Sequence, residues 1–354
     1  MAIKVEKFGE TSDGMQADLY TLTNENGVSA SFTNLGGTWV SMLVPDKKGE
    51  MGDVILGYDT MEKYLVNVPH FGAIIGRNAN RIGGAAYTLN GESYSLYANN
   101  GPNNLHSGPN YYHTRFWEVE LDEGDEGSRI VFSLSSPDMD QGFPGNAQIT
   151  VSYTLTKDNS IAIEYHMLSD ADTVVNLTNH CYFNLAGHGS GPVLDQQVWI
   201  DADTFTPADE VAIPYGTILP VKGTPMDFTV MKAIGRDIGM DYDQLIMGKG
   251  YDHNWVLNHK QGEIGLSAKA FDPVSGRIME VYTDLPGLQF YTGNFLEDSV
   301  DVLGKGGAVY GYRCGFCFET QYYPDSINKP QFPSVVLRAG EAFQSTTIYK
   351  FMRE

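Results

Sequence analysis

The sequence predicts an all-β protein, built as a large antiparallel β-sandwich with a few short helices. Three observations predict this class. Apolar residues recur at every second position in many short runs, hydrophobic residues make up 42% of the 354 residues, and there are 39 glycines. Alternation is typical of half-buried strands, and frequent glycine fits frequent turns. Long helical patterns between the strands, which would indicate a parallel α/β sheet, are missing from the sequence.

The alternating runs follow one another along the chain. They cover residues 28–32, 38–44, 116–121, 130–134, 149–155, 161–168, 174–185, 198–200, 255–257, 264–271, 278–283, 288–291, 315–323 and 345–351. Turn-forming pairs occur at Asn26-Gly27, Asn90-Gly91, Asp158-Asn159 and Ser275-Gly276. Because Asn, Asp and Gly adopt the positive φ angles of tight turns, we expect β-hairpins at these four pairs.

Helical signals are few and short. Residues 60–65 could form a helix capped by Asp59, with Glu62 as the partner in a capping box. Residues 229–234 and 241–247 could each form one or two turns, and the acidic segment 122–127 fits a hairpin tip. No linker or internal repeat divides the sequence, so we expect a single domain over residues 1–354.

The composition narrows the choice of partners. The formal net charge is −21, from 23 Lys and Arg against 44 Asp and Glu. This charge disfavours nucleic acid and anionic membrane surfaces, because both attract basic proteins. The N-terminus lacks the apolar core of a signal peptide, and the three cysteines indicate reduced thiols, so we expect a cytoplasmic protein. Cys314 and Cys317 fall on opposite faces of a predicted strand, which gives them no redox or metal role.

Polar residues interrupt the alternating pattern in four places. In segment 173–187, His180 and Tyr182 share one strand face, and in segment 315–324, Glu319 follows four uncharged residues. Segment 71–84, followed by the loop 98–108, presents Arg77, Arg81 and several Asn, and segments 251–257 and 285–294 add Asp252 and Gln289. These side chains could line a polar site, or they could lie on a solvated outer face.

The residue types point to acid–base chemistry on a sugar. The eight His residues include no pair at a spacing typical of zinc ligands, and the serine nucleophile motif G-x-S-x-G is missing, so we expect neither a metal nor a cofactor. A His, carboxylates, amides and aromatic residues remain. Aromatic rings stack on the apolar faces of sugars, while amides and carboxylates bind hydroxyls.

Six motifs together resemble the aldose 1-epimerase (galactose mutarotase) family. They are NLGGTW at 34–39, GRNANRI at 76–82, NLHSG at 104–108, NLTNHCYFNL at 176–185, YDH at 251–253 and FETQYYPD at 318–325. They occur in the family's order and span nearly the whole chain. The resemblance implies a large antiparallel β-sandwich and interconversion of the α and β anomers of free aldohexoses such as glucose and galactose.

The resemblance also implies roles for matching residues. Glu319 would be the catalytic base and His180 the catalytic acid. The sugar would be held by the side chains of Asn80, Arg81, His106, Tyr182, Asp252 and Gln289. The base removes the proton of the C1 hydroxyl while the acid protonates the ring oxygen, which opens the ring and allows closure to the other anomer.

This mechanism starts from an ionised Glu319 and a protonated His180. We therefore expect a bell-shaped pH profile, with its acidic limb from Glu319 and its basic limb from His180. Three other functions stay open: a carbohydrate-binding sandwich without activity, a glycosidase using Asp252 and Glu319, and an epimerase of hexose phosphates. The last would need Arg77 and Arg81 for the phosphate. The small-molecule sugar is the expected partner of a monomer or homodimer.

Overall fold

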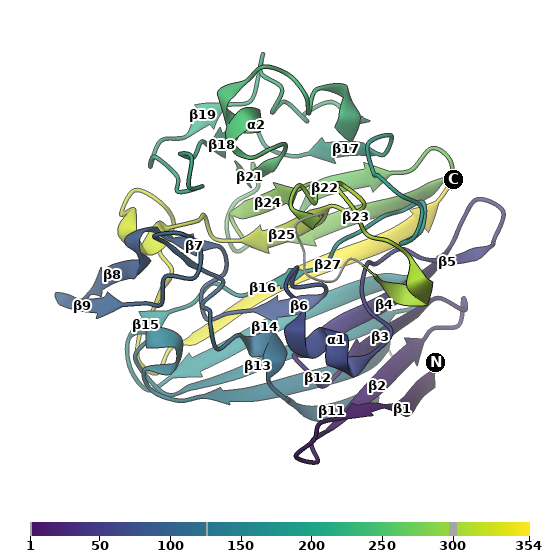
Figure 1. Cartoon of the computed structure of the whole chain (residues 1–354), viewed down its shortest axis with the longest axis horizontal. Coiled ribbons are helices and arrows are strands. Elements are labelled where there is room, and N and C mark those ends of the chain that lie inside the picture. The colour runs from purple at the N-terminus through teal and green to yellow at the C-terminus, as the bar shows by residue number, and fades with distance from the viewer. Residues whose placement is uncertain (1, 125–126, 297–302) are drawn as a thin grey trace.

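Antiparallel sheets dominate the computed structural model, which describes residues 2–124, 127–296 and 303–354 (Figure 1). The largest sheet has nine strands. In spatial order they are β11 (Glu118–Gly124), β12 (Gly127–Ser136), β13 (Ala147–Thr156), β14 (Ser160–Ser169), β27 (Ala342–Arg353), β23 (Arg277–Thr283), β22 (Gly265–Phe271), β17 (Gln197–Ile200) and β20 (Lys232–Ala233).

Two five-stranded sheets accompany the large one. The first comprises β1 (Ala2–Glu10), β2 (Gln16–Thr23), β3 (Ser29–Thr33), β4 (Thr38–Pro45) and β5 (Met51–Asp53) in chain order. The second runs in the order β19 (Leu219–Pro220), β18 (Thr204–Thr206), β21 (Asp252–Val256), β24 (Gly287–Tyr291) and β25 (Cys317–Gln321).

Short strand pairs and helices complete the described structure. The pairs are β6 (Ala73–Ile75) with β16 (Thr178–His180), β7 (Arg81–Ile82) with β10 (Asn104–Leu105), β8 (Ala86–Leu89) with β9 (Glu92–Ser95), and β15 (Thr173–Val174) with β26 (Val336–Leu337). The α-helices are α1 (Met61–Val66) and α2 (Asp243–Met247). Within the described residues, no helix is long and apolar enough to cross a membrane.

Both five-stranded sheets pack on the nine-stranded sheet. Trp39 of β4 lies 6.4 Å from Tyr153 and 5.8 Å from Tyr349, measured between ring centroids. The hydroxyl of Tyr349 donates to the carbonyl of Phe318 on β25 at 2.7 Å. These contacts join two layers into a β-sandwich whose main hydrophobic cluster includes residues from Tyr20 to Phe351. The predicted fold class is confirmed.

All four predicted hairpins are present. They connect β2 to β3, β8 to β9, β13 to β14 and β22 to β23. The acidic segment 122–127 also lies at a hairpin, since Gly124 pairs with Gly127, although residues 125–126 lie outside the described residues.

Three local predictions are wrong. The single strand expected at 174–185 is broken between β15 and β16, because Asn176 bonds with its amide side chain to the backbone of Tyr322. Within residues 229–234, Lys232–Ala233 form β20, which pairs with β17, and the helical turn begins later than expected, as a 3₁₀ turn at Ile234–Arg236. Helix α1 forms one residue later than expected, and Asp59 does not cap it, because its carboxylate accepts a hydrogen bond from the backbone of Gly306.

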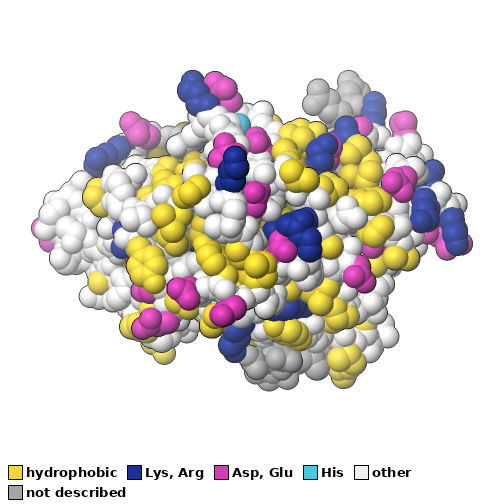
Figure 2. Space-filling view, turned by 90° about the horizontal axis from the view of Figure 1, so that it is seen from above, with side chains coloured by type: hydrophobic (Ala, Val, Ile, Leu, Met, Phe, Trp, Pro, Cys, Tyr) yellow, Lys and Arg dark blue, Asp and Glu magenta, His cyan; other side chains and the backbone are white. Residues whose placement is uncertain are grey.

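The outer surface carries charges of both signs. Figure 2 shows Lys and Arg side chains lying beside Asp and Glu, with apolar patches between them, rather than one continuous basic area. This face therefore lacks the basic surface that nucleic acid binding requires.

Candidate active site

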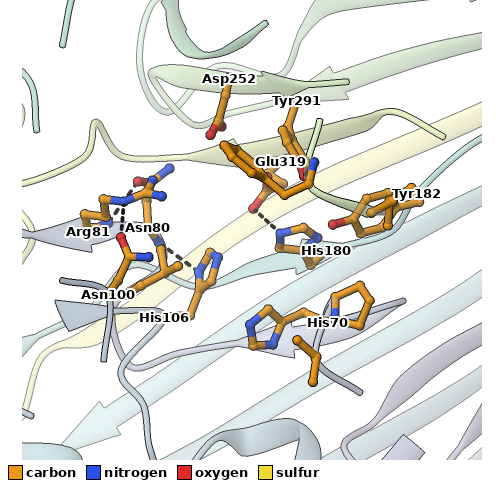
Figure 3. A pocket seen from close by; sticks show the side chains of 15 residues that line it. His70, Asn80, Arg81, Asn100, His106, His180, Tyr182, Asp252, Tyr291 and Glu319 are labelled. Atoms are coloured by element: carbon orange, nitrogen blue, oxygen red, sulfur yellow. Dashed lines mark hydrogen bonds and ion pairs between the residues drawn. The ribbon is translucent and has the colours of Figure 1, made fainter. Parts of the chain in front are cut away.

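A cavity of about 330 Å³, with polar and apolar side chains in its lining, lies where the second five-stranded sheet meets the loops around β6, β7 and β10 (Figure 3). Its lining includes His70, Asn80, Arg81, Asn100, His106, His180, Tyr182, Asp252, Tyr291 and Glu319. Seven of the eight residues predicted from the sequence line this one cavity. The eighth, Gln289, lies behind Asp252.

Strand alternation aims Glu319 into the cavity. On β25, Phe318 and Thr320 point toward the nine-stranded sheet, where the hydroxyl of Thr320 lies 2.6 Å from that of Thr347. Cys317, Glu319 and Gln321 therefore point to the opposite side. On β16, the amide of Asn179 donates to the Tyr153 hydroxyl, so the side chain of His180 points away from the core.

The turn between β6 and β7 positions the polar side chains opposite. Asn80 has a positive φ of 61°, and its backbone N–H donates to Nδ1 of His106 at 3.1 Å. The guanidinium of Arg81 donates to the side chain of Asn100 at 2.9 Å. Arg77, four residues earlier, is fully buried on the other side of the turn. Its guanidinium donates to Ser136 and to several backbone carbonyls.

Glu319 and His180 form a close pair. Oε2 of Glu319 lies 3.7 Å from Nε2 of His180, and both side chains are at most 7% exposed. Oε2 has no hydrogen-bond partner among the described residues. Burial, with the neighbouring Asp252, raises the pKa of Glu319 well above its usual value, while Arg81 opposes that rise. Burial and the nearby His70 lower the pKa of His180 to about 3.

These pKa shifts correct the expected charge state. Burial favours a protonated Glu319 and a neutral His180, not the ion pair expected from the sequence. Burial explains the difference, because it disfavours both charged forms. The pair nevertheless carries one proton in either arrangement, so the two states differ only in where that proton lies.

Gln289 holds Asp252 by a hydrogen bond. The amide of Gln289 donates to Oδ1 of Asp252 at 2.7 Å. Burial raises the pKa of Asp252, while Arg81 and the Gln289 hydrogen bond lower it. Gln289 thus occupies Oδ1 of Asp252, and the other carboxylate oxygen, Oδ2, is the atom available to a ligand in the cavity.

His106 is arranged to donate a hydrogen bond. Because its Nδ1 accepts from the backbone N–H of Asn80, the neutral ring carries its hydrogen on Nε2. Burial lowers the pKa of His106 well below its usual value, which keeps the ring neutral. His106, His180 and Glu319 bring their nitrogen and oxygen atoms within 4.8 Å of one another, a spacing that could hold a metal ion. However, a nitrogen that carries hydrogen offers no lone pair to a cation, so this tautomer of His106 disfavours such a site.

Three hydrogen-bonding residues of the cavity were not predicted as site residues: His70, Asn100 and Tyr291. The apolar part of the lining was not predicted either: Val68, Pro69, Leu105, Phe295 and Leu296. Asn100 lies in the polar loop 98–108 and Tyr291 ends a predicted strand, but neither pattern indicates a role in binding. His70 lies just before the segment 71–84 and has no sequence signal of its own.

Comparison with known proteins identifies the relatives of this chain. The profile of the family described as aldose 1-epimerase matches residues 18–350. A galactose mutarotase of Rattus norvegicus is 40% identical over 347 residues, covering 98% of this chain and 94% of the relative. An aldose 1-epimerase of Escherichia coli is 38% identical over 344 residues, covering 97% of each chain. The crystal structure of a galactose 1-epimerase from Lactobacillus acidophilus superimposes with a TM-score of 0.87, at 26% identity over 99% of both chains.

Proposed function

We propose that this chain, which belongs to the aldose 1-epimerase family, interconverts the α and β anomers of free aldohexoses such as glucose and galactose. The observation that carries the proposal is the buried pair of Glu319 and His180 at 3.7 Å, inside a cavity lined by both hydrogen-bonding and apolar side chains.

The spacing of the pair suits the two proton transfers. The C1 hydroxyl oxygen and the ring oxygen of a pyranose are both bonded to C1, so a base and an acid side by side reach both at once. Glu319 takes the proton of the C1 hydroxyl as His180 gives a proton to the ring oxygen, and the bond between C1 and the ring oxygen breaks. Rotation about the C1–C2 bond and reversal of both transfers yield the other anomer.

Glu319 and His180 together carry one proton, as this exchange of protons with the sugar requires. After ring opening, Glu319 is protonated and His180 is neutral, which is the state that burial favours. Ring opening therefore requires the proton to lie on His180 when the cyclic sugar is bound. Arg81 favours that state, because its positive charge lowers the pKa of Glu319.

The remaining residues supply binding. His106 donates from Nε2, Arg81 and Asn80 present donors, and the free oxygen of Asp252 accepts from a sugar hydroxyl. Tyr182 stacks on the ring of His180 at 5.2 Å and holds it in place. Gln289 acts through Asp252.

A phosphorylated sugar is a poorer fit. Of the two arginines that the sequence offered for a phosphate, Arg77 is fully buried and bonded to Ser136 and backbone carbonyls. Arg81 is then the single arginine or lysine among the described residues that line the cavity.

We also place the protein in the cytoplasm, which is consistent with its three free cysteines, all of them buried.

Polarimetry on freshly dissolved α-glucose and α-galactose tests the proposal. The protein should accelerate the approach to the equilibrium rotation, and dialysis against EDTA should leave the rate unchanged. A protein that binds galactose without changing the rate would be a carbohydrate-binding module. Release of a reducing sugar from an aryl glycoside would instead indicate a glycosidase.

A further inference from the structure

His70 occupies a fixed position at the edge of the cavity. It lies in the turn 67–72 between α1 and β6, with a positive φ of 61°. The side chain of Asn67 closes this turn, because it accepts from the backbone N–H of Phe71 at 2.9 Å and donates to the carbonyl of the same residue at 3.1 Å. The turn therefore holds the His70 ring against the cavity rather than leaving it to move with solvent.

One nitrogen of His70 is already in use. Its Nδ1 lies 3.4 Å from Nδ1 of His113, a distance at which one ring donates and the other accepts. His113 is itself buried and stacks on Tyr111 at 4.9 Å, so the pair is fixed from behind. Nε2 of His70 makes no hydrogen bond to any residue that the structure describes, and the ring lines the cavity.

The chemistry of this nitrogen selects a hydroxyl group. Burial lowers the pKa of His70 to about 4, so the ring is neutral near pH 7. Either tautomer of the His70 and His113 pair is allowed, which makes Nε2 a donor or an acceptor. A hydroxyl can match both, whereas a carboxylate or phosphate can only accept and would favour a charged ring.

The order of the side chains locates that hydroxyl on the sugar. Figure 3 shows His180 lying between Glu319 and His70. Glu319 lies 3.7 Å from His180, and the rings of His180 and His70 are 5.8 Å apart. In a pyranose, the ring oxygen joins C1 to C5, and C5 carries C6. If Glu319 faces the C1 hydroxyl and His180 the ring oxygen, the next group along the ring faces the side of the cavity formed by His70 and His106, whose rings are 5.2 Å apart.

We infer that His70 is a specificity-determining residue that hydrogen-bonds the C6 hydroxyl, so that the chain prefers hexoses to otherwise identical sugars without that hydroxyl. The inference rests on the proposed function. A site that bonds a substrate hydroxyl discriminates against the analogue that lacks it, because its polar group is left unpaired. Since His70 is half-buried at the edge of the cavity, we expect a preference of about 10-fold.

The test compares D-galactose with 6-deoxy-D-galactose, which differ only at C6. In the wild type, kcat/KM should be about 10-fold higher for galactose. His70→Phe should bring this ratio close to 1. The ratio is the informative quantity, because His70 also lowers the pKa of His180 and its loss acts on that residue with both sugars. His70→Gln retains a donor and an acceptor and should keep most of the preference. His166→Phe, on β14 outside the cavity, is the matched control and should leave the ratio unchanged.

Each outcome decides between the two proposals. A wild type that converts both sugars equally well, or a folded His70→Phe variant that keeps the wild-type ratio, overturns the role of His70. If His70→Phe does not fold, His70→Ala answers the same question, with loss of the ratio expected and its retention contradictory. A wild type that does not accelerate mutarotation of galactose at all would instead refute the proposed function.

Discussion

The nine-stranded sheet and the wall of the cavity are both made of antiparallel strands, but the faces that point away from the core differ in burial. On β13, the apolar residues Ile149, Val151 and Tyr153 are buried, while Thr150 and Thr154 on the other face are half-exposed, although Ser152 between them is buried. On β25 every residue from Cys317 to Gln321 is buried, including Glu319. Alternation thus sets the direction of a side chain in both places, whereas loops that cover the outer face of β25 decide whether a polar side chain meets water or a cavity.

Replacing Glu319 should give the largest effect. In Glu319→Gln the shape of the cavity is kept but the base is lost, so kcat should fall by at least ~10²-fold with a modest change in KM. The measurement is the initial rate of mutarotation by polarimetry over a range of galactose concentrations. Thr320→Val is a matched control from the opposite face of β25, and should reduce stability by about 1 kcal/mol without lowering kcat. Near-normal kcat in Glu319→Gln would make Asp252 the next candidate for the base.

Replacing His180 should lower kcat by a similar or somewhat smaller factor, about 10²-fold. The pH profile of kcat/KM should be bell-shaped in the wild type. The acidic limb should mark uptake of a second proton by the pair, near the lowered pKa of His180. The basic limb should mark loss of the last proton, at the raised pKa of Glu319. This reverses the limbs expected from the sequence, and both limbs belong to the coupled pair.

His180→Asn tests this order of titration. The variant should lose the acidic limb assigned to the pair and most of its rate. If it keeps most of its rate and an unchanged profile, His180 is a structural residue and the acid is to be sought at His106.

Part of this site was accessible from the sequence and part was not. Strand periodicity placed His180 with Tyr182 and separated Glu319 from Phe318, and the structure shows those directions. The resemblance to a family, rather than periodicity, brought β25, β16 and the β6–β7 turn to one place, because contacts between distant segments leave no local pattern. The pKa shifts were also hidden, since they arise from burial by loops. The role of Arg77 could not be read from the sequence either. It shares a motif with Arg81, but its side chain is buried and bonds to Ser136 and backbone carbonyls instead of lining the cavity.

Variants of Arg77 and Arg81 test whether the first arginine stabilises the fold and the second binds the sugar. In Arg77→Met, Ser136 and several buried carbonyls lose their donor, so the free energy of unfolding should fall by about 3 kcal/mol or more, with KM little changed in the folded protein. Arg81→Met should instead raise KM and leave stability nearly constant. Urea unfolding and mutarotation kinetics on both variants distinguish these results. An equal loss of stability in the two variants would show that both arginines are structural.

The smallest expected effect is on the pH dependence of stability. Burial lowers the pKa of His253 on β21 to about 4. Between pH 6.5 and about 4, His253 is therefore protonated in the unfolded chain but neutral in the folded chain. The free energy of unfolding falls as the pH is lowered through this window. His253→Gln removes that proton, so its stability should fall less steeply, by about 1 kcal/mol between pH 6 and pH 5.

The slope is the informative quantity, because His253 also accepts a hydrogen bond from the backbone of Asp252, and its loss lowers stability at every pH. Urea unfolding at pH 5, 6 and 7 gives the slope for the wild type, for His253→Gln and for His166→Gln as a control on the half-exposed face of β14. The carboxyls of Glu319 and Asp252 titrate in the opposite sense, since their raised pKa values favour the folded state at low pH. They are common to all three proteins and cancel in the comparison, so a slope in His253→Gln equal to that of the wild type would show that His253 takes up its proton in the folded state.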